Sequence, residues 1–185
     1  MRLFLAIVPD QRAINKIYPQ ILKFKEHAHG GNFTSAGNLH LTVVFIGEVD
    51  DAGCDRLKRI VNSISFDPFI VKTRQIGFFA NRGANDILVW HLDPTKELIA
   101  LCDSVRHACL NEGFVIDQRQ YRPHFTLARK VRWAEGFLNR PDALVVPTVH
   151  LRSERLSLME SIRLDGRLVY REIHGKTMAP AIGQE

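Results

Sequence analysis

The sequence has few cysteines and no motif that pairs them. The three cysteines are Cys54, Cys102 and Cys109, and no Cys-x-x-Cys occurs. Cys102 and Cys109 lie seven residues apart in a pattern typical of a helix. We therefore predict buried, reduced thiols rather than a disulfide framework or a zinc site.

Long apolar runs are absent as well. The stretch from Met1 to Val8 is too short for the apolar part of a signal peptide, and it ends at Pro9-Asp10. No segment approaches the roughly 20 apolar residues that a membrane-spanning helix needs. Together with the reduced thiols, this predicts a cytoplasmic protein without a membrane partner.

Several catalytic signatures are missing. The chain has no His-Glu-x-x-His, no Gly-x-Ser-x-Gly, no phosphate-binding loop and no dinucleotide fingerprint. The spacing typical of metal ligands is missing too. We expect neither a metal nor another cofactor.

The overall composition is that of an ordinary globular protein. The 185 residues are 45% hydrophobic and 24% charged, which suffices for one domain or for two small lobes that share a cleft. The 25 Lys and Arg outnumber the 20 Asp and Glu, giving a net charge of +5. This balance favours an anionic partner such as nucleic acid without requiring one.

Two stretches share one unusual pattern. Residues 38–47 contain His40 and Thr42, residues 122–129 contain His124 and Thr126, and both read His-apolar-Thr-apolar. Successive side chains of a strand point to opposite faces, so each histidine shares a face with its threonine. Each histidine also begins a run of residues that favour a β-strand, and this shared context makes the repeat more informative than two His-x-Thr triplets alone.

The remaining pattern predicts an α+β or mixed α/β fold. Helical spacing of apolar residues indicates helices over about 13–27, after Asp50 or Asp51, and after Pro94-Thr95. A short helix is expected over 133–138. Strands are expected over 2–8, 40–47, 69–79, 87–92, 122–129, 143–149, 156–162 and 168–173, with 69–79 and 87–92 forming a hairpin through the loop 81–86. Residues 29–38 are expected to be a loop, and the tail from Gly175 to fray.

Two histidines facing each other suit phosphoester chemistry. With an ordinary pKa of about 6.5, one imidazole can be neutral as a base while the other is protonated as an acid. The base takes a proton from the attacking water, and the acid gives one to the departing ribose oxygen. Thr42 and Thr126 can hydrogen-bond the phosphate oxygens, so this chemistry requires no metal.

Positive charge surrounds the second histidine. From residue 119 to residue 132 the chain has no acidic residue and carries Arg119, Arg122, Arg129, Lys130 and Arg132. Such a run favours phosphate binding. The alternative is an RNA-binding module in which His40 and His124 have only structural roles.

Phe45 and the remaining histidines are predicted to have no catalytic role from the pattern alone. Strict alternation from His40 puts Phe45 on the opposite face, in the core with Leu41 and Val43, unless a bulge reorients it. The histidines without the threonine pattern are expected at the surface or in loops: His27, His29, His91, His107, His150 and His174.

At these residues the sequence resembles the two-histidine (2H) phosphoesterase superfamily, most closely its RNA 2′,3′-cyclic phosphodiesterases of the ThpR or LigT-like group. The similar blocks occur in the family's order over nearly the whole chain. They are residues 2–6, 38–42, 45–49, 121–129 and 158–161. The resemblance implies one bilobal α+β domain over 1–185, in which two antiparallel sheets flank a central cleft, helices lie outside, and the two lobes are pseudo-symmetric.

The resemblance also implies roles for single residues. His40 matches the proton donor and His124 the proton acceptor in metal-independent hydrolysis of an RNA 2′,3′-cyclic phosphate to a 2′-phosphomonoester. Thr42 and Thr126 would hold the phosphate, and Phe45 and Arg129 would enclose a nucleobase. Arg122 is a further candidate for substrate binding.

The family leaves the substrate open. Its members include ligases or hydrolases of 2′,5′-linkages and enzymes acting on other small cyclic phosphates. The expected partners are RNA or oligonucleotide ends, or small cyclic nucleotides, bound by a monomer.

Overall fold

Two antiparallel sheets carry the two histidine segments in a computed structural model that describes residues 1–81 and 84–179. The four-stranded sheet has the order β3-β1-β8-β9, and the five-stranded sheet has the order β2-β6-β5-β4-β7. Their strands are β1 (Arg2–Ile7), β2 (Ala28–Phe33), β3 (Leu41–Glu48), β4 (Phe69–Asn81), β5 (Ala84–Leu92), β6 (His124–Trp133), β7 (His150–Ser153), β8 (Arg155–Leu164) and β9 (Arg167–Thr177).

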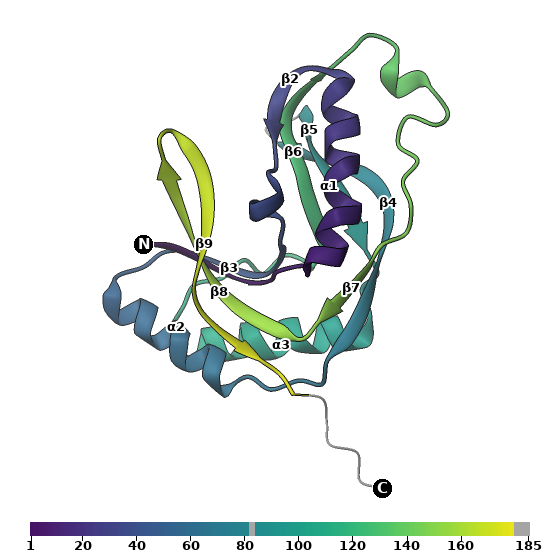
Figure 1. Ribbon diagram of the computed structural model, residues 1–185. Helices are drawn as coiled ribbons and strands as arrows, with labels where there is room; N and C mark the ends of the chain where they lie inside the picture. Colours follow the sequence, from purple (N-terminus) through teal and green to yellow (C-terminus); the bar gives the residue numbers. More distant parts are fainter. Residues whose placement is uncertain (82–83, 180–185) are drawn as a thin grey trace, which may run out of the picture.

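Three helices among the described residues cover the sheets (Figure 1). They are α1 (Gln11–Glu26), α2 (Asp51–Ser63) and α3 (Lys96–Asn111). Helix α1 lies against the five-stranded sheet, while α2 and α3 lie beneath the four-stranded sheet. This arrangement confirms the α+β fold with helices on the outside. No described helix is long and apolar enough to cross a membrane.

The helix starts follow from their capping residues. Asp50 accepts a hydrogen bond from the Gly53 amide at 2.7 Å and begins α2, and Thr95 does the same for Leu98 at 3.3 Å and begins α3. Such caps satisfy amides that have no partner inside the helix. Both starts agree with the sequence prediction.

The thiols lie in the core between these layers. Cys54, Cys102 and Cys109 are all buried and unpaired. Burial raises the pKa of Cys102 and of Cys109 to about 12, so both are protonated thiols at neutral pH. The prediction of buried, reduced cysteines is confirmed.

Three local predictions are wrong. The first part of the expected loop at 29–38 belongs instead to β2, whose polar residues pair with β6 at the edge of the five-stranded sheet. The expected helix at 133–138 is replaced by the end of β6 and a short 3-10 helix η2 (Phe137–Asn139), because Gly136 has φ 73°. Residues 145–149 form no strand, since Pro147 cannot donate to a ladder, and β7 starts only at His150.

The C-terminal strand is longer than expected. β9 continues through Gly175 to Thr177, and the next residue, Met178, is 6% exposed and donates its amide to the Glu154 carbonyl at 2.7 Å. The chain therefore does not fray at Gly175, because pairing with β8 continues to its end. Residues 180–185 lie outside the described residues, as does 82–83 in the predicted hairpin loop between β4 and β5.

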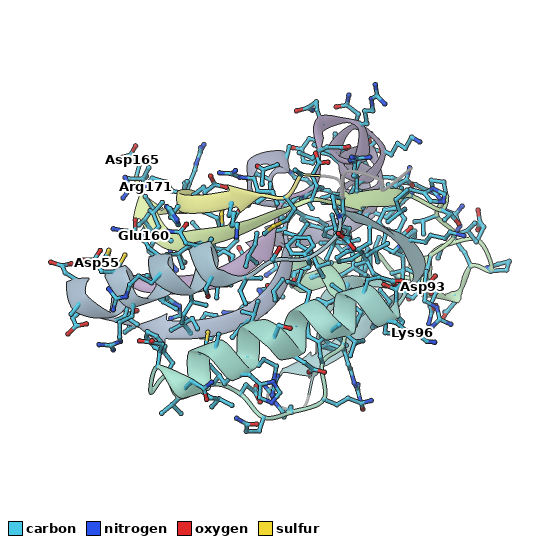
Figure 2. All side chains as sticks on the ribbon, turned by 90° about the horizontal axis from the view of Figure 1, so that it is seen from below. Asp55, Asp93, Lys96, Glu160, Asp165 and Arg171 are labelled. Carbon is cyan, nitrogen blue, oxygen red and sulfur yellow. The ribbon has the colours of Figure 1, made fainter. Side chains whose placement is uncertain are left out.

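The β8–β9 hairpin extends beyond the sheet beside the N-terminus (Figure 1). Figure 2 shows Glu160 and Arg171 next to each other on it, where Arg171 donates to the Glu160 carboxylate at 2.6 Å. Glu160 is only 7% exposed, so this pair neutralises a buried charge on the hairpin.

Candidate active site

The two histidine stretches have the same pattern of burial. From His40 to Phe45, and from His124 to Arg129, the side chains are in turn half-buried, buried, half-buried, buried, buried and exposed. Each histidine therefore shares the accessible face of its strand with the threonine two residues on, as alternation predicts. The two buried residues in succession show that the alternation then breaks.

A bulge in each strand causes this break. In β3 the register skips Val43, because Thr42 pairs with Ala6 and Val44 with Leu5 of β1. In β6 it skips Leu127 between the pairs made with β5. An extra residue in one strand turns the following side chains to the other face.

Phe45 is consequently on the face of His40 and Thr42. Its side chain is 46% exposed, and the guanidinium carbon of Arg2 lies 5.2 Å from the ring centroid. The prediction from strict alternation, which placed Phe45 in the core, is wrong for this reason. Arg129 takes the equivalent exposed position after the bulge of β6.

His40 is held on three sides. Its Nδ1 lies 2.8 Å from the Asn38 carbonyl oxygen, and the rings of Phe4 and Tyr170 each lie 4.8 Å from its own. Because a carbonyl oxygen only accepts, Nδ1 carries the hydrogen and Nε2 is left for chemistry. Burial lowers the pKa of His40, and the positive charges of His124 and Arg129 lower it further, against the opposing effect of the Asn38 hydrogen bond.

His124 is held in the same way. Its Nδ1 lies 2.7 Å from the Arg122 carbonyl oxygen, and the Phe79 ring stands edge-on at 4.8 Å. Burial lowers the pKa of His124, and His91 and Arg129 lower it further, against the opposing effect of the Arg122 hydrogen bond. His40 senses the charge of His124, and both sense Arg129, so these three groups share one electrostatic environment.

A cavity of about 680 Å³ opens beside His124. Thr42 and Phe45 of the first histidine stretch line it together with His124 and Phe79. Its rim is polar and formed by Arg106, Asp117, Arg119, Gln120, Tyr121 and Arg122. His40, Thr126 and Arg129 are not among the residues that line this cavity.

The two histidine stretches are tied across the chain. Tyr121, just before the second stretch, donates its hydroxyl to the Thr42 carbonyl at 2.8 Å. Thr34, in the segment that leads to the first stretch, donates its hydroxyl to the Thr126 carbonyl at 2.8 Å. The segment leading to each histidine thus fixes the backbone of the other threonine. The threonine hydroxyls themselves make no hydrogen bond within residues 1–81 and 84–179.

His91 is a neighbour of the site that the sequence analysis missed. It is paired with His124 in the register of β5 and β6, and the Phe79 ring lies 5.5 Å from it. A Cβ on Gly77 would approach His91 Nε2 to 2.6 Å, so the glycine makes room for the ring. The surface or loop prediction for His91 is wrong, and only the strand register, which no motif carries, would have revealed it.

The described residues contain no group of three or more His, Cys, Asp or Glu side chains arranged to hold a metal ion. The histidines His40, His91 and His124 lie among arginines and one acidic residue of the cavity lining, Asp117, which is paired with Arg119.

The family is shown by comparison with known proteins. The family model of the 2′-5′ RNA ligase superfamily matches residues 11–164. The chain therefore belongs to this superfamily.

Its curated relatives are more specific. The RNA 2′,3′-cyclic phosphodiesterase of Bacillus subtilis (strain 168) is 30% identical over 181 residues, which is 92% of this chain and 92% of the relative. That of Methanocaldococcus jannaschii is 36% identical over 134 residues, 70% of this chain and 71% of the relative. These matches make the chain an enzyme of the RNA 2′,3′-cyclic phosphodiesterase family, as the motifs predicted.

A solved relative has the same fold. E. coli LigT in apo form superposes with a TM-score of 0.75 at 24% identity, covering 96% of both chains. LigT complexed with 3′-AMP gives 0.75 at 25% identity, covering 96% of this chain and 97% of the other. The LigT-like fold expected from the resemblance is thereby confirmed.

Proposed function

We propose that this enzyme hydrolyses the 2′,3′-cyclic phosphate of an RNA end to a 2′-phosphomonoester, with His40 as proton donor and His124 as proton acceptor. The observation that carries the proposal is the matched geometry of the two rings. Each has Nδ1 fixed by the carbonyl two residues earlier, at 2.8 Å and 2.7 Å, which leaves each Nε2 for proton transfer.

The proposed reaction is one in-line displacement. His124 Nε2 takes a proton from water while the water oxygen forms a bond to phosphorus. The bond from phosphorus to O3′ breaks, and His40 Nε2 gives its proton to that oxygen. The products are a 2′-phosphomonoester and a 3′-hydroxyl, and solvent exchange restores the two protonation states. Each proton transfer contributes roughly 10² to 10⁴ in rate.

The threonines are assigned to the phosphate. Thr42 and Thr126 stand on the faces of their histidines, and their carbonyls are fixed by Tyr121 and Thr34. Hydroxyls on a backbone fixed in this way can donate to the non-bridging phosphate oxygens as negative charge grows on these oxygens. Arg129, whose charge reaches both histidines, would offset the charge of the phosphate.

The proposed substrate is an RNA end rather than a small cyclic nucleotide alone. Arg106, Arg119 and Arg122 line the cavity that opens from His124, and Arg119 is paired with Asp117. This rim suits the phosphates of a longer chain. Arg2 lies over the Phe45 ring, and this ring, which is 46% exposed and lines the cavity, could stack on a base.

The test is turnover of an oligonucleotide that ends in a 2′,3′-cyclic phosphate. We expect a 2′-phosphate product, activity unchanged by EDTA, and loss of turnover in both His40→Ala and His124→Ala while oligonucleotide binding persists. A 3′-phosphate product or inactivation by EDTA would contradict the proposed chemistry. Binding by the wild type without any turnover would favour the RNA-binding module with structural histidines.

A further inference from the structure

We propose that Asn38 is a positioning residue that aims His40 by docking onto the edge of β9. The proposal rests on the proposed function of His40 as the acid. Asn38 is the last residue of the 3-10 helix η1 (Ala36–Asn38), and its backbone carbonyl is the group that holds His40 Nδ1 at 2.8 Å. Whatever fixes this carbonyl also fixes the histidine ring.

The Asn38 side chain is anchored twice to one strand. Its Nδ2 donates to the Leu168 carbonyl at 2.8 Å, and its Oδ1 accepts from the Tyr170 amide at 3.0 Å. β9 is an edge strand of the four-stranded sheet, and residues 168 and 170 present their backbone groups to the same side. A primary amide has the donor and acceptor of a peptide group, so Asn38 takes the place of a neighbouring strand.

The same piece of β9 also contacts the histidine directly. The Tyr170 ring stands edge-on to His40 with centroids 4.8 Å apart, and Phe4 contacts both rings, at 4.8 Å from His40 and 5.1 Å from Tyr170. Through Asn38 and Tyr170, the edge of β9 therefore determines both the hydrogen bond of His40 and the wall against which it packs.

Within residues 1–81 and 84–179, no side-chain hydrogen bond anchors the residue that holds His124 in the way that Asn38 is anchored. The carbonyl that holds His124 Nδ1 belongs to Arg122, whose side chain lines the cavity. The backbone of Arg122 is fixed by the following residue, Pro123, whose carbonyl accepts a hydrogen bond from the Leu92 amide at 2.9 Å. A change at Asn38 should therefore affect His40 alone, which separates positioning from a general loss of structure.

The test compares Asn38→Ala and Asn38→Asp with Asn62→Ala. Asn62 is the matched control, because its side chain also hydrogen-bonds a β9 residue, His174, at 2.8 Å. His174 lies further along β9 than Tyr170, the strand residue that contacts His40. Asn38→Asp retains an acceptor for the Tyr170 amide and replaces the donor by an oxygen facing the Leu168 carbonyl. All three are measured for kcat, KM and the ¹⁵N shifts of their histidine ring nitrogens.

We expect wild-type neutral His40 to be the Nδ1–H tautomer. In Asn38→Ala this preference should weaken while His124 keeps its own, and kcat should fall about tenfold or more with KM little changed, because a misaimed acid affects the chemical step. Asn38→Asp should show the same loss and, by its charge, a higher His40 pKa. Asn62→Ala should retain wild-type values.

Asn38→Ala with the wild-type tautomer and kcat would overturn the proposal, as would equal losses in Asn38→Ala and Asn62→Ala. The ring-nitrogen shifts do not depend on turnover. Absence of activity in the wild type would therefore count against the proposed function, whereas an unchanged His40 tautomer in both Asn38 variants would count against the positioning role.

Discussion

Arg129 is the charged residue that the two histidines have in common. Its charge lowers the pKa of both His40 and His124, although it lies on β6 with only one of them. A cation in this position attracts a phosphate in the ground state and in the transition state alike. It also makes both histidines easier to deprotonate in the free enzyme.

Arg129→Gln should therefore change binding and titration together. We expect KM to rise about tenfold, equivalent to about 1.4 kcal/mol, with a smaller change in kcat. Removing the positive charge stabilises both imidazolium forms, so both limbs of the kcat/KM profile should move to higher pH. The control is Arg132→Gln, which makes the same change at an exposed arginine three positions further along β6. A loss in kcat alone would show that Arg129 acts in the chemical step instead.

Phe45 is a second single residue whose substitution tests the site. Its ring is 46% exposed, so Phe45→Ala should change the free energy of unfolding by no more than about 0.5 kcal/mol. Base stacking on an aromatic ring contributes about 1 to 3 kcal/mol, so KM should rise at least about fivefold. Phe125→Ala, at a fully buried ring, should instead cost about 3 to 5 kcal/mol of stability. Denaturant unfolding and steady-state kinetics distinguish these outcomes, and an unchanged KM would remove Phe45 from the substrate site.

The part of the site that could be predicted is the part that depends only on neighbouring residues in the sequence. The pairs His40–Thr42 and His124–Thr126 could be predicted because residues two positions apart in a regular strand share a face. The exposed position of Phe45 could not be derived from alternation, because the extra residue at Val43 reverses the alternation and depends on how β1 pairs, and only the family resemblance implied a substrate-binding role for Phe45. His91 could not either, since its place beside His124 is set by the register between β5 and β6.

Among the elements, two hydrogen bonds, from Tyr121 to the Thr42 carbonyl and from Thr34 to the Thr126 carbonyl, hold the two histidine stretches in place. The Tyr121 hydroxyl donates to the Thr42 carbonyl, and burial raises the pKa of Tyr121 well above its ordinary value, so the phenol keeps its proton. β3 is an edge strand, which leaves this carbonyl without a partner strand on its outer side. The tie therefore substitutes for a missing ladder bond.

Tyr121→Phe should weaken this tie without opening a cavity. We expect a loss of about 0.5 to 1.5 kcal/mol in the free energy of unfolding, since a partly buried carbonyl loses its donor. Because Thr42 lies at the loosened position, kcat should fall as well. Tyr18→Phe makes the same chemical change at a half-buried tyrosine whose hydroxyl has no hydrogen bond within residues 1–81 and 84–179. Equal effects of the two changes on kcat would contradict the role given to the tie.

Elements with strong local signals were predictable and those that depend on distant pairing were not. Helices α2 and α3 start at Asp50 and Thr95 because the caps are encoded beside them. β2 has a polar, glycine-containing sequence and becomes a strand only because β6 offers an edge. The end of β9 is ordered for the same reason, since its partner β8 extends equally far.

At the scale of the whole molecule, the two sheets bring together histidines that are remote in sequence, and burial shifts their titration. The pKa of His40 and that of His124 both lie below the ordinary value of 6.5, chiefly because the rings are buried. The two rings also interact, so the apparent pKa values belong to the pair. Bound phosphate adds negative charge beside both rings and should raise both values in the complex.

The pH dependence of turnover is the most direct test of two-histidine catalysis. With chemistry rate-limiting, kcat/KM should follow a bell with its optimum below pH 6.5, where the free-enzyme pKa values are centred, and the bell in kcat should lie at higher pH. On the acidic side the base His124 becomes protonated, and on the alkaline side the acid His40 loses its proton. The small residual activity of His124→Ala should lack the acidic limb, whereas loss of the alkaline limb would mean that the roles are exchanged. A profile that is flat from about pH 5 to about pH 9 would contradict the two-histidine mechanism itself.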